Sequence, residues 1–191
     1  MRKIISKYKE NKRKRRNGMI IGIILVGVML FSILGYAFGG QDDNDIKKID
    51  YNGFEFVEQN GFWFTNTENF QLVFKYNPQQ VEKIDSELKY LNNYYGKTLY
   101  ISSENSEAES EIYRNLFYQN QIVERMQSAC LEGEICNENL PVKTCDDNFI
   151  IIKPNNISEI TQEKNCVFIK GEEENLTKIT DEFLFKIFEI R

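Results

Sequence analysis

The feature that most constrains this chain is an unbroken apolar segment near its N-terminus. Residues 19–38 read MIIGIILVGVMLFSILGYAF and hold no charged side chain. At about 1.5 Å per residue, a helix of this segment would be roughly 30 Å long, the thickness of the hydrocarbon core of a bilayer. A helix in a protein core normally keeps a polar stripe, which this segment lacks. The sequence therefore predicts a transmembrane helix over residues 19–38, which would contact the lipid bilayer.

The charges on either side of this segment predict its orientation. Residues 1–18 form a basic tail that reaches the apolar segment through KRKRR at 12–16, and residues 39–49 form an acid-rich juxtamembrane linker. Positive charge is retained on the cytoplasmic side of a membrane. We therefore expect a cell-membrane protein with its N-terminus in the cytoplasm and a domain over residues 50–191 outside.

Two other interpretations of the N-terminus remain open. Ala37-Phe38-Gly39 fits a signal-peptidase site, so the helix could be removed by cleavage after Gly39. The apolar run is longer than the usual signal-peptide core of about 7–15 residues, which favours retention as a signal-anchor. Asn17-Gly18 resembles the end of a pilin-type leader, but the glutamate usual in such helices is missing.

The charge balance excludes several functions for the outer domain. Nine of the 24 basic residues and one of the 29 acidic residues lie within residues 1–40, which leaves the remainder with a net charge of −13. A domain so acidic repels phosphates, so no nucleic-acid partner is expected for it. The chain has no histidine, which excludes Ser-His-Asp and Cys-His catalysis and histidine-based zinc sites.

The cysteines predict disulfides. All four lie in the outward part, at Cys130, Cys136, Cys145 and Cys166, and no C-x-x-C is present. The spacing therefore fits neither a thioredoxin-type pair nor a zinc ribbon, and an even number in an extracytoplasmic domain indicates two disulfides. Three pairings are possible. The preferred one joins Cys130 with Cys136 around a short loop at a helix end, and Cys145 with Cys166 at the start of two hairpin strands.

Two further features belong to the outer side. Asn156 and Asn175 each begin an N-x-[ST] sequon, where a glycan would attach if the host modifies such sites. Four acids cluster in the cysteine-bearing loops: Glu132, Glu134, Asp146 and Asp147. They would form either a metal or substrate site held by the disulfides or a solvated acidic loop, and the solvated loop is preferred.

Aromatic residues predict an antiparallel meander at the start of the outer domain. Phenylalanines recur with period two, which is typical of strands. The three strands are expected at 53–58, 62–65 and 69–76. Asn60-Gly61 accepts the positive φ angles of a type I′ hairpin turn. Trp63 would lie on the face opposite Phe62 and Phe64, where packing against another element is preferred to sugar binding.

Two long helices are expected after the meander. Ser106 and Glu109 fit a capping box, and an apolar stripe extends the predicted helix over 106–130. The second covers 173–190. Pro78 is placed to begin a short helix that would end near Ile84.

Dense apolar runs predict three more strands. They are expected at 98–102, 148–153 and 165–170. A right-handed crossover would make the first two parallel, with the third antiparallel beside the second. The expected fold is α+β: an N-terminal transmembrane helix, then one domain with an antiparallel β-meander and a mixed sheet packed by two long helices.

Several stretches taken together resemble one group of proteins. They are Gly61-Phe-Trp-Phe64, Phe74-Lys-Tyr-Asn-Pro78, Tyr95-Gly-Lys-Thr-Leu-Tyr-Ile101, Cys130-Leu-Glu-Gly-Glu134, Leu140-Pro-Val-Lys-Thr-Cys145 and Cys166-Val-Phe-Ile-Lys-Gly171. Over most of residues 50–190 the chain resembles uncharacterised single-pass membrane-anchored proteins of small-genome archaea. The resemblance implies an archaeal envelope setting and brings no activity or site residue with it.

Two hypotheses for function follow. The chain has no P-loop, no G-x-S-x-G and no S-x-x-K, so no catalytic, cofactor-binding or metal-ligating residue is singled out and no cofactor is expected. The preferred hypothesis is a non-catalytic interaction or scaffold module that binds an unknown protein partner in the cell envelope. The alternative is a carboxylate-based extracellular hydrolase acting on glycans, which requires a cleft with two acids about 5–10 Å apart.

Overall fold

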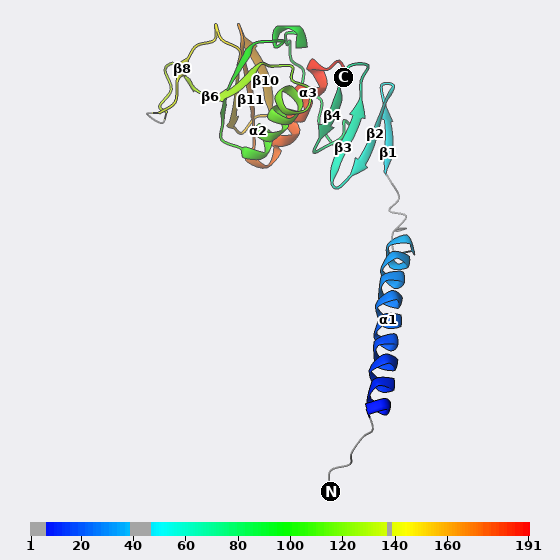
Figure 1. Ribbon diagram of the computed structural model, residues 1–191. Coiled ribbons are helices and arrows are strands. Elements are labelled where there is room, and N and C mark those ends of the chain that lie inside the picture. The colour runs from blue at the N-terminus through cyan, green and yellow to red at the C-terminus, as the bar shows by residue number, and fades with distance from the viewer. Residues whose placement is uncertain (1–6, 39–46, 137–138) are drawn as a thin grey trace. The chain divides into compact units, whose positions relative to one another are not determined.

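The computed structural model describes residues 7–38, 47–136 and 139–191, and within its first helix the side chains of residues 15–31. The chain forms two compact units, residues 1–45 and residues 46–191. Figure 1 shows both as ribbons. The first unit contains α1, which spans Lys7–Phe38.

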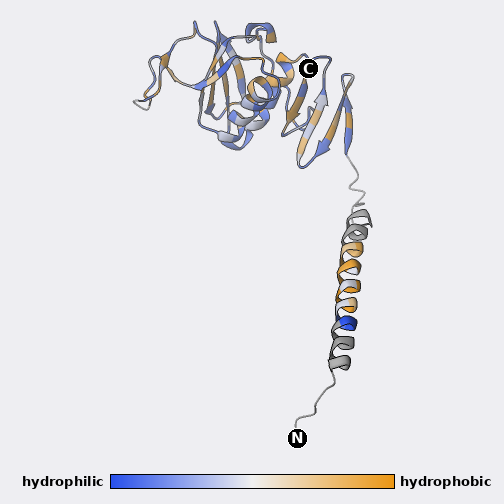
Figure 2. Ribbon diagram, viewed as in Figure 1, coloured by the Kyte–Doolittle hydropathy of each residue, from blue (hydrophilic) through white to orange (hydrophobic). Residues whose placement is uncertain are grey.

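The apolar segment lies within α1. Figure 2 shows hydrophobic residues along most of the described part of this helix, and its large apolar side chains between Met19 and Phe31 are 48% to 78% exposed. Among the residues whose side chains are described, no helix combines the length and the hydropathy needed to cross a membrane. Residues 32–38 of the predicted span lie outside these described side chains, so the transmembrane helix stays a prediction.

The second unit has the predicted α+β fold, with two main sheets. The antiparallel sheet has the strand order β1-β2-β3-β4, and the mixed sheet has the order β10-β11-β9-β5-β6. A short parallel pair, β7-β8, lies apart from them. The strands are β1 Lys48–Tyr51, β2 Phe54–Gln59, β3 Phe62–Asn66, β4 Gln71–Phe74, β5 Thr98–Ser103, β6 Arg125–Ser128, β7 Cys130–Leu131, β8 Val142–Lys143, β9 Phe149–Pro154, β10 Glu159–Glu163 and β11 Cys166–Gly171.

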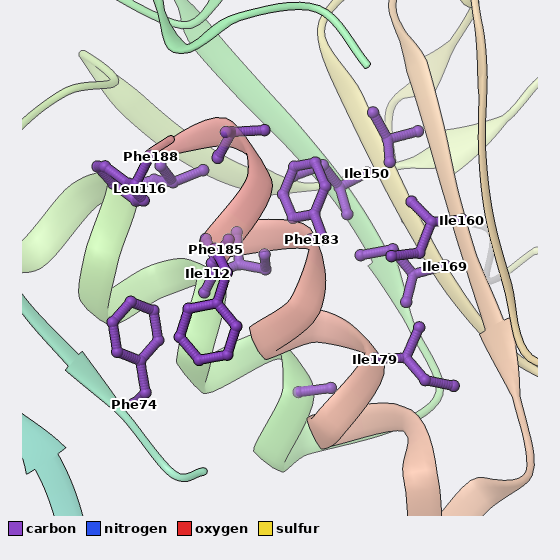
Figure 3. Packing of buried hydrophobic residues seen from close by; sticks show 14 of the residues in the cluster. Phe74, Ile112, Leu116, Ile150, Ile160, Ile169, Ile179, Phe183, Phe185 and Phe188 are labelled. Carbon is purple, nitrogen blue, oxygen red and sulfur yellow. The ribbon is translucent and has the colours of Figure 1, made fainter. Parts of the chain in front are cut away.

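Two helices form a layer between these sheets (Figure 1). The helical segments are η1 Leu91–Asn93, α2 Ser106–Ile112, the π-helical η2 Tyr113–Tyr118, η3 Glu173–Asn175 and α3 Leu176–Ile187. Ten of the twelve residues of α3 are buried because this helix packs against both sheets. In Figure 3, Ile179 and Phe183 lie toward the isoleucines of the mixed sheet. The ring of Phe185 meets Phe74 of the antiparallel sheet, with their centroids 4.6 Å apart.

The antiparallel sheet confirms the predicted meander and adds a strand. Asn60 and Gly61 have φ angles of 53° and 76°, as the predicted hairpin turn requires. Asn52 and Gly53 repeat this turn with φ angles of 48° and 86°. They join β2 to β1, which begins at Lys48 and so lies partly within the predicted linker. Residues 48 and 49 of the predicted linker therefore belong to β1, because the second Asn-Gly turn extends the sheet by one strand.

The predicted helix over 106–130 is wrong beyond residue 118. The helical segment closes when the N–H groups of Ile122 and Val123 both donate to the carbonyl of Leu116. Gln121, with a φ of 49°, then turns the chain out of the helix. Residues 125–128 become β6, paired parallel with β5. Pairing with a free sheet edge outweighed a weak helical stripe, since short apolar runs suit either structure.

The predicted orientation of the third strand in the mixed sheet is also wrong. β11 pairs parallel with β9, not antiparallel. A strand that the sequence analysis missed, β10, lies between them along the chain and forms an antiparallel hairpin with β11. Lys164, with a φ of 52°, occupies its two-residue turn. The predicted parallel relation between β5 and β9 is confirmed.

Two smaller helix predictions need correction. Residues 78–80 form only a turn, because the Asn77 side chain accepts hydrogen bonds from the backbone N–H groups of Gln79 and Gln80. The N-cap of α2 is Asn105, whose side chain accepts from the N–H of Ala108. The predicted capping box at Ser106 was therefore placed one residue late.

Candidate functional site

The cysteine-bearing loops cover the face of the mixed sheet that the helices leave free. Cys130 pairs with Cys136 and Cys145 pairs with Cys166, as preferred from the sequence, and no cysteine is free. The second disulfide does not join two strands of a hairpin, although the sequence predicted that it would. Cys166 begins β11, and Cys145 lies just before β9, so the disulfide joins the starts of two parallel strands. Their neighbours Tyr100, Phe149 and Ile151 form a small second core there.

The acids of these loops are mostly paired with lysines. Glu134 forms an ion pair with Lys153. Asp146 lies 3.0 Å from Lys164, and Asp147 lies 3.9 Å from Lys143, whereas Glu132 forms no ion pair with the described residues. Exposed pairs of this kind contribute about 0–1 kcal/mol. Within the described ranges, no three Asp, Glu, Cys or His side chains are grouped to hold a metal ion.

A different group of acids lines a surface depression of about 600 Å³. Its lining residues are Asn105, Glu107, Glu172, Glu173, Glu174 and Thr177. They follow the carboxyl ends of β5 and β11, where ligands often bind in sheets with parallel strands. The Thr177 hydroxyl donates to Glu107 at 3.2 Å, and the Asn105 amide donates to the carbonyl of Glu173 at 3.3 Å. These bonds tie the start of α2 to the start of the C-terminal helix.

A pair of buried carboxyl groups lies deeper, between α2 and α3. Glu111 and Asp181 are both fully buried. One Glu111 oxygen accepts from Arg114 at 2.8 Å, and one Asp181 oxygen accepts from the N–H of Tyr76 at 2.9 Å. In the part of the chain that the structure describes, the other oxygen of each group has no further partner. The charge of Glu111 acts on Asp181 across the packed helices.

Burial raises the pKa of both carboxyls. Burial raises the pKa of Asp181 well above its ordinary value, and the charge of Glu111 raises it further. Burial also raises the pKa of Glu111, although the guanidinium of Arg114 opposes that effect. The pKa of Asp181 is therefore the more strongly raised of the two, because Arg114 offsets part of the effect of burial at Glu111. Neither carboxyl lines the acidic depression.

A second depression, the outer groove, lies on the solvent-facing side of the antiparallel sheet. Its volume is about 250 Å³. It is lined by Glu55, Val57, Gln59, Phe64, Asn66 and Gln71. The opposite face of the same strands carries Phe56, Trp63 and Leu72, all buried in the core. The predicted separation of Trp63 from Phe62 and Phe64 is therefore confirmed, and Trp63 is the one that packs inside.

No protein-family model, curated protein or solved structure matches this chain.

The two sequons lie in different environments. Asn156 is exposed in the loop between β9 and β10, where an attached glycan would meet no obstacle. Asn175 is half-buried, and its side chain donates to Glu172 at 3.3 Å. The Thr177 that completes its sequon is buried. Asn156 is thus the more accessible of the two acceptors.

The sequence analysis missed the acidic depression and the carboxyl pair for the same reason. Glu107 and Glu173 are 66 positions apart, and Glu111 and Asp181 are 70 apart. Only the packing of α2 against α3 brings them together. One local signal was present: Asp181 lies within the apolar stripe of α3, where a carboxylate is not expected unless it has a specific role.

Proposed function

We propose that this protein is a membrane-anchored module of the cell envelope whose outer domain binds a partner without catalysing a reaction. The N-terminal basic tail would lie in the cytoplasm, residues 19–38 would span the bilayer, and residues 46–191 would lie outside. An archaeal envelope is the proposed setting.

The observation that carries the outward placement is the pairing of all four cysteines into two disulfides. Disulfides persist in oxidising compartments and are rare in the reducing cytosol. The large apolar side chains of α1 support the anchor, since an exposed apolar surface of this kind requires cover from lipid or protein. The basic residues before the span support the orientation.

The positions of the perturbed acids support a non-catalytic role. General acid catalysis at neutral pH uses a carboxyl with a raised pKa that can reach substrate. Burial raises the pKa of Glu111, Asp181 and Glu182, and none of the three lines either depression. Glu182 is already held by an ion pair with Arg191.

Crosslinking in native membranes tests the interaction role. Intact cells that express the full chain are treated with a membrane-impermeant amine crosslinker, and the adducts are purified and mapped by mass spectrometry. We expect one defined envelope protein joined to lysines of residues 46–191. The control keeps residues 1–45 and carries an unrelated outer domain. A complete lack of adducts, or the same adducts with the control, would contradict the proposal.

One observation favours the alternative of a glycan hydrolase. Four glutamates line the acidic depression, and such an enzyme needs two carboxyls across its cleft. Under this alternative, the chain releases reducing ends from a neutral glycan, and Glu107→Gln or Glu173→Gln lowers the rate at least 100-fold, on the scale of a lost acid or base. The control is Glu68→Gln, at an exposed position outside the depression. Equal release by all four proteins would eliminate the hydrolase.

A further inference from the structure

The outer groove has an apolar floor formed by Val57 of β2 and Phe64 of β3, which pair across the two strands. Val73 of β4 pairs with Phe64 but is buried and does not line the groove. Val57 and Phe64 are only half-buried. Two apolar side chains that water can reach, at the centre of a hollow, are the type of surface that a small ligand covers.

The neighbouring aromatic ring on this face is already covered. Phe62 has the guanidinium of Arg114 at 4.6 Å from its ring centre and the ammonium of Lys75 at 5.3 Å. Phe64 lines the groove and has no such cation over its ring among the described residues. The two phenylalanines thus share a strand and a face, and they differ in whether the ring is free to stack on a ligand.

The rim of the groove consists mainly of amides. Gln59, Asn66 and Gln71 are exposed around the apolar floor. Gln71 is held in place, because its oxygen accepts from Gln119 at 2.8 Å. A primary amide both donates and accepts hydrogen bonds, so it can bind a hydroxyl group in either sense.

The charge of the groove excludes anionic ligands. Glu55 is its one ionisable residue among the described residues that line it, and Lys48 lies 3.2 Å from the Glu55 carboxylate. A phosphate or sulfate would find no lining cation there. The volume of about 250 Å³ is near the lower limit for small-molecule pockets and far below what a protein partner of about 800 Å² per side would need.

We propose that the outer groove binds a neutral saccharide. A sugar ring has an apolar face of C–H groups and a rim of hydroxyls, which match the Phe64 ring and the three amides. This inference deepens the proposed interaction role by naming a ligand class. It rests on that role only for the compartment in which the protein meets the ligand. The acidic depression of the alternative hydrolase is a separate site.

Titration of the full chain with simple sugars tests the proposal. The probes are glucose, mannose, galactose and N-acetylglucosamine, each added to about 50 mM, because a small groove of this kind should bind in the millimolar range. The chain is kept in phospholipid nanodiscs, since many detergents carry sugar headgroups. The readout is the shift of backbone amide resonances of β2, β3 and β4. We expect saturable shifts there with at least one sugar.

Variants assign the site. Phe64→Ala and Asn66→Ala should weaken binding at least tenfold, Phe64→Tyr should retain it, and the matched control Phe62→Ala should bind like wild type. Glucose 6-phosphate should bind more weakly than glucose. The proposal would be overturned by no saturable shift with any probe, by shifts outside the groove, or by binding that Phe64→Ala and Asn66→Ala both leave intact. If crosslinking finds no partner but the sugars bind as expected, only the proposed protein partner is refuted.

Discussion

The raised pKa values of the buried Glu111 and Asp181 carboxyls predict a specific dependence of stability on pH. Their raised pKa values mean that the folded chain holds a proton that the unfolded chain releases above about pH 4. The stabilisation that depends on this proton is fully present below the unfolded pKa values and is lost as pH rises toward the folded ones. One proton corresponds to a slope of about 1.4 kcal/mol per pH unit.

The substitution Asp181→Asn should remove this slope. The amide oxygen keeps the hydrogen bond from Tyr76, and the neutral amide replaces a carboxyl that must take a proton from solution to become neutral. Two pH units above the unfolded pKa of the pair, Asp181→Asn should therefore be more stable than wild type by up to about 3 kcal/mol. Asp181→Ala instead leaves the N–H of Tyr76 without its acceptor and should cost about 1–3 kcal/mol even at low pH.

Urea unfolding of the full chain between about pH 4 and pH 8 measures these differences. Trp63, the single tryptophan, is 6% exposed on β3 and reports unfolding by fluorescence. Asp146→Asn, at an exposed carboxyl paired with Lys164, is the control and should keep the wild-type slope. The quantity of interest is the difference between wild type and Asp181→Asn at each pH. A difference that does not change with pH would refute the raised pKa values of Glu111 and Asp181.

Three further predictions concern stability. Arg191→Ala should cost about 3–5 kcal/mol in urea unfolding, because it leaves a fully buried carboxylate without its cation. Replacing both cysteines of the Cys145–Cys166 disulfide by serine should cost about 3 kcal/mol. The same change at Cys130–Cys136, which closes a shorter loop, should cost about 2 kcal/mol. Equal losses would contradict the loop-entropy reasoning. Asn115→Ala should cost about 1–3 kcal/mol and promote aggregation seen by light scattering, since its amide covers the edge of β4 by bonding both backbone groups of Val73.

The parts of this fold that local chemistry determines could be predicted. The meander followed from alternating aromatics and Asn60-Gly61, because both act over a few residues. The disulfides followed from cysteine number and position. The second Asn-Gly turn, at Asn52-Gly53, carried the same signal and would have predicted β1 as well.

The remaining errors concern pairings between distant residues. Residues 125–128 suit a helix or a strand, and the free edge of β5 decided between them. The direction of β11 depended on β10, a polar edge strand whose apolar content is small. The acidic depression and the carboxyl pair require α2 and α3 to be packed together, and the acid within the apolar stripe at Asp181 does not reveal which residue it meets.

The central proposal, an anchored chain with its domain outside, is tested most directly by labelling native lysines. Intact cells that express the full chain are treated with a membrane-impermeant amine reagent, and modified peptides are counted by mass spectrometry before and after lysis. Lys83, exposed in the second unit, should be modified before lysis, whereas Lys12 and Lys14 of the basic tail should be modified only after it. Modification of Lys83 only after lysis would contradict the outward placement, and early modification of all three would contradict the membrane span.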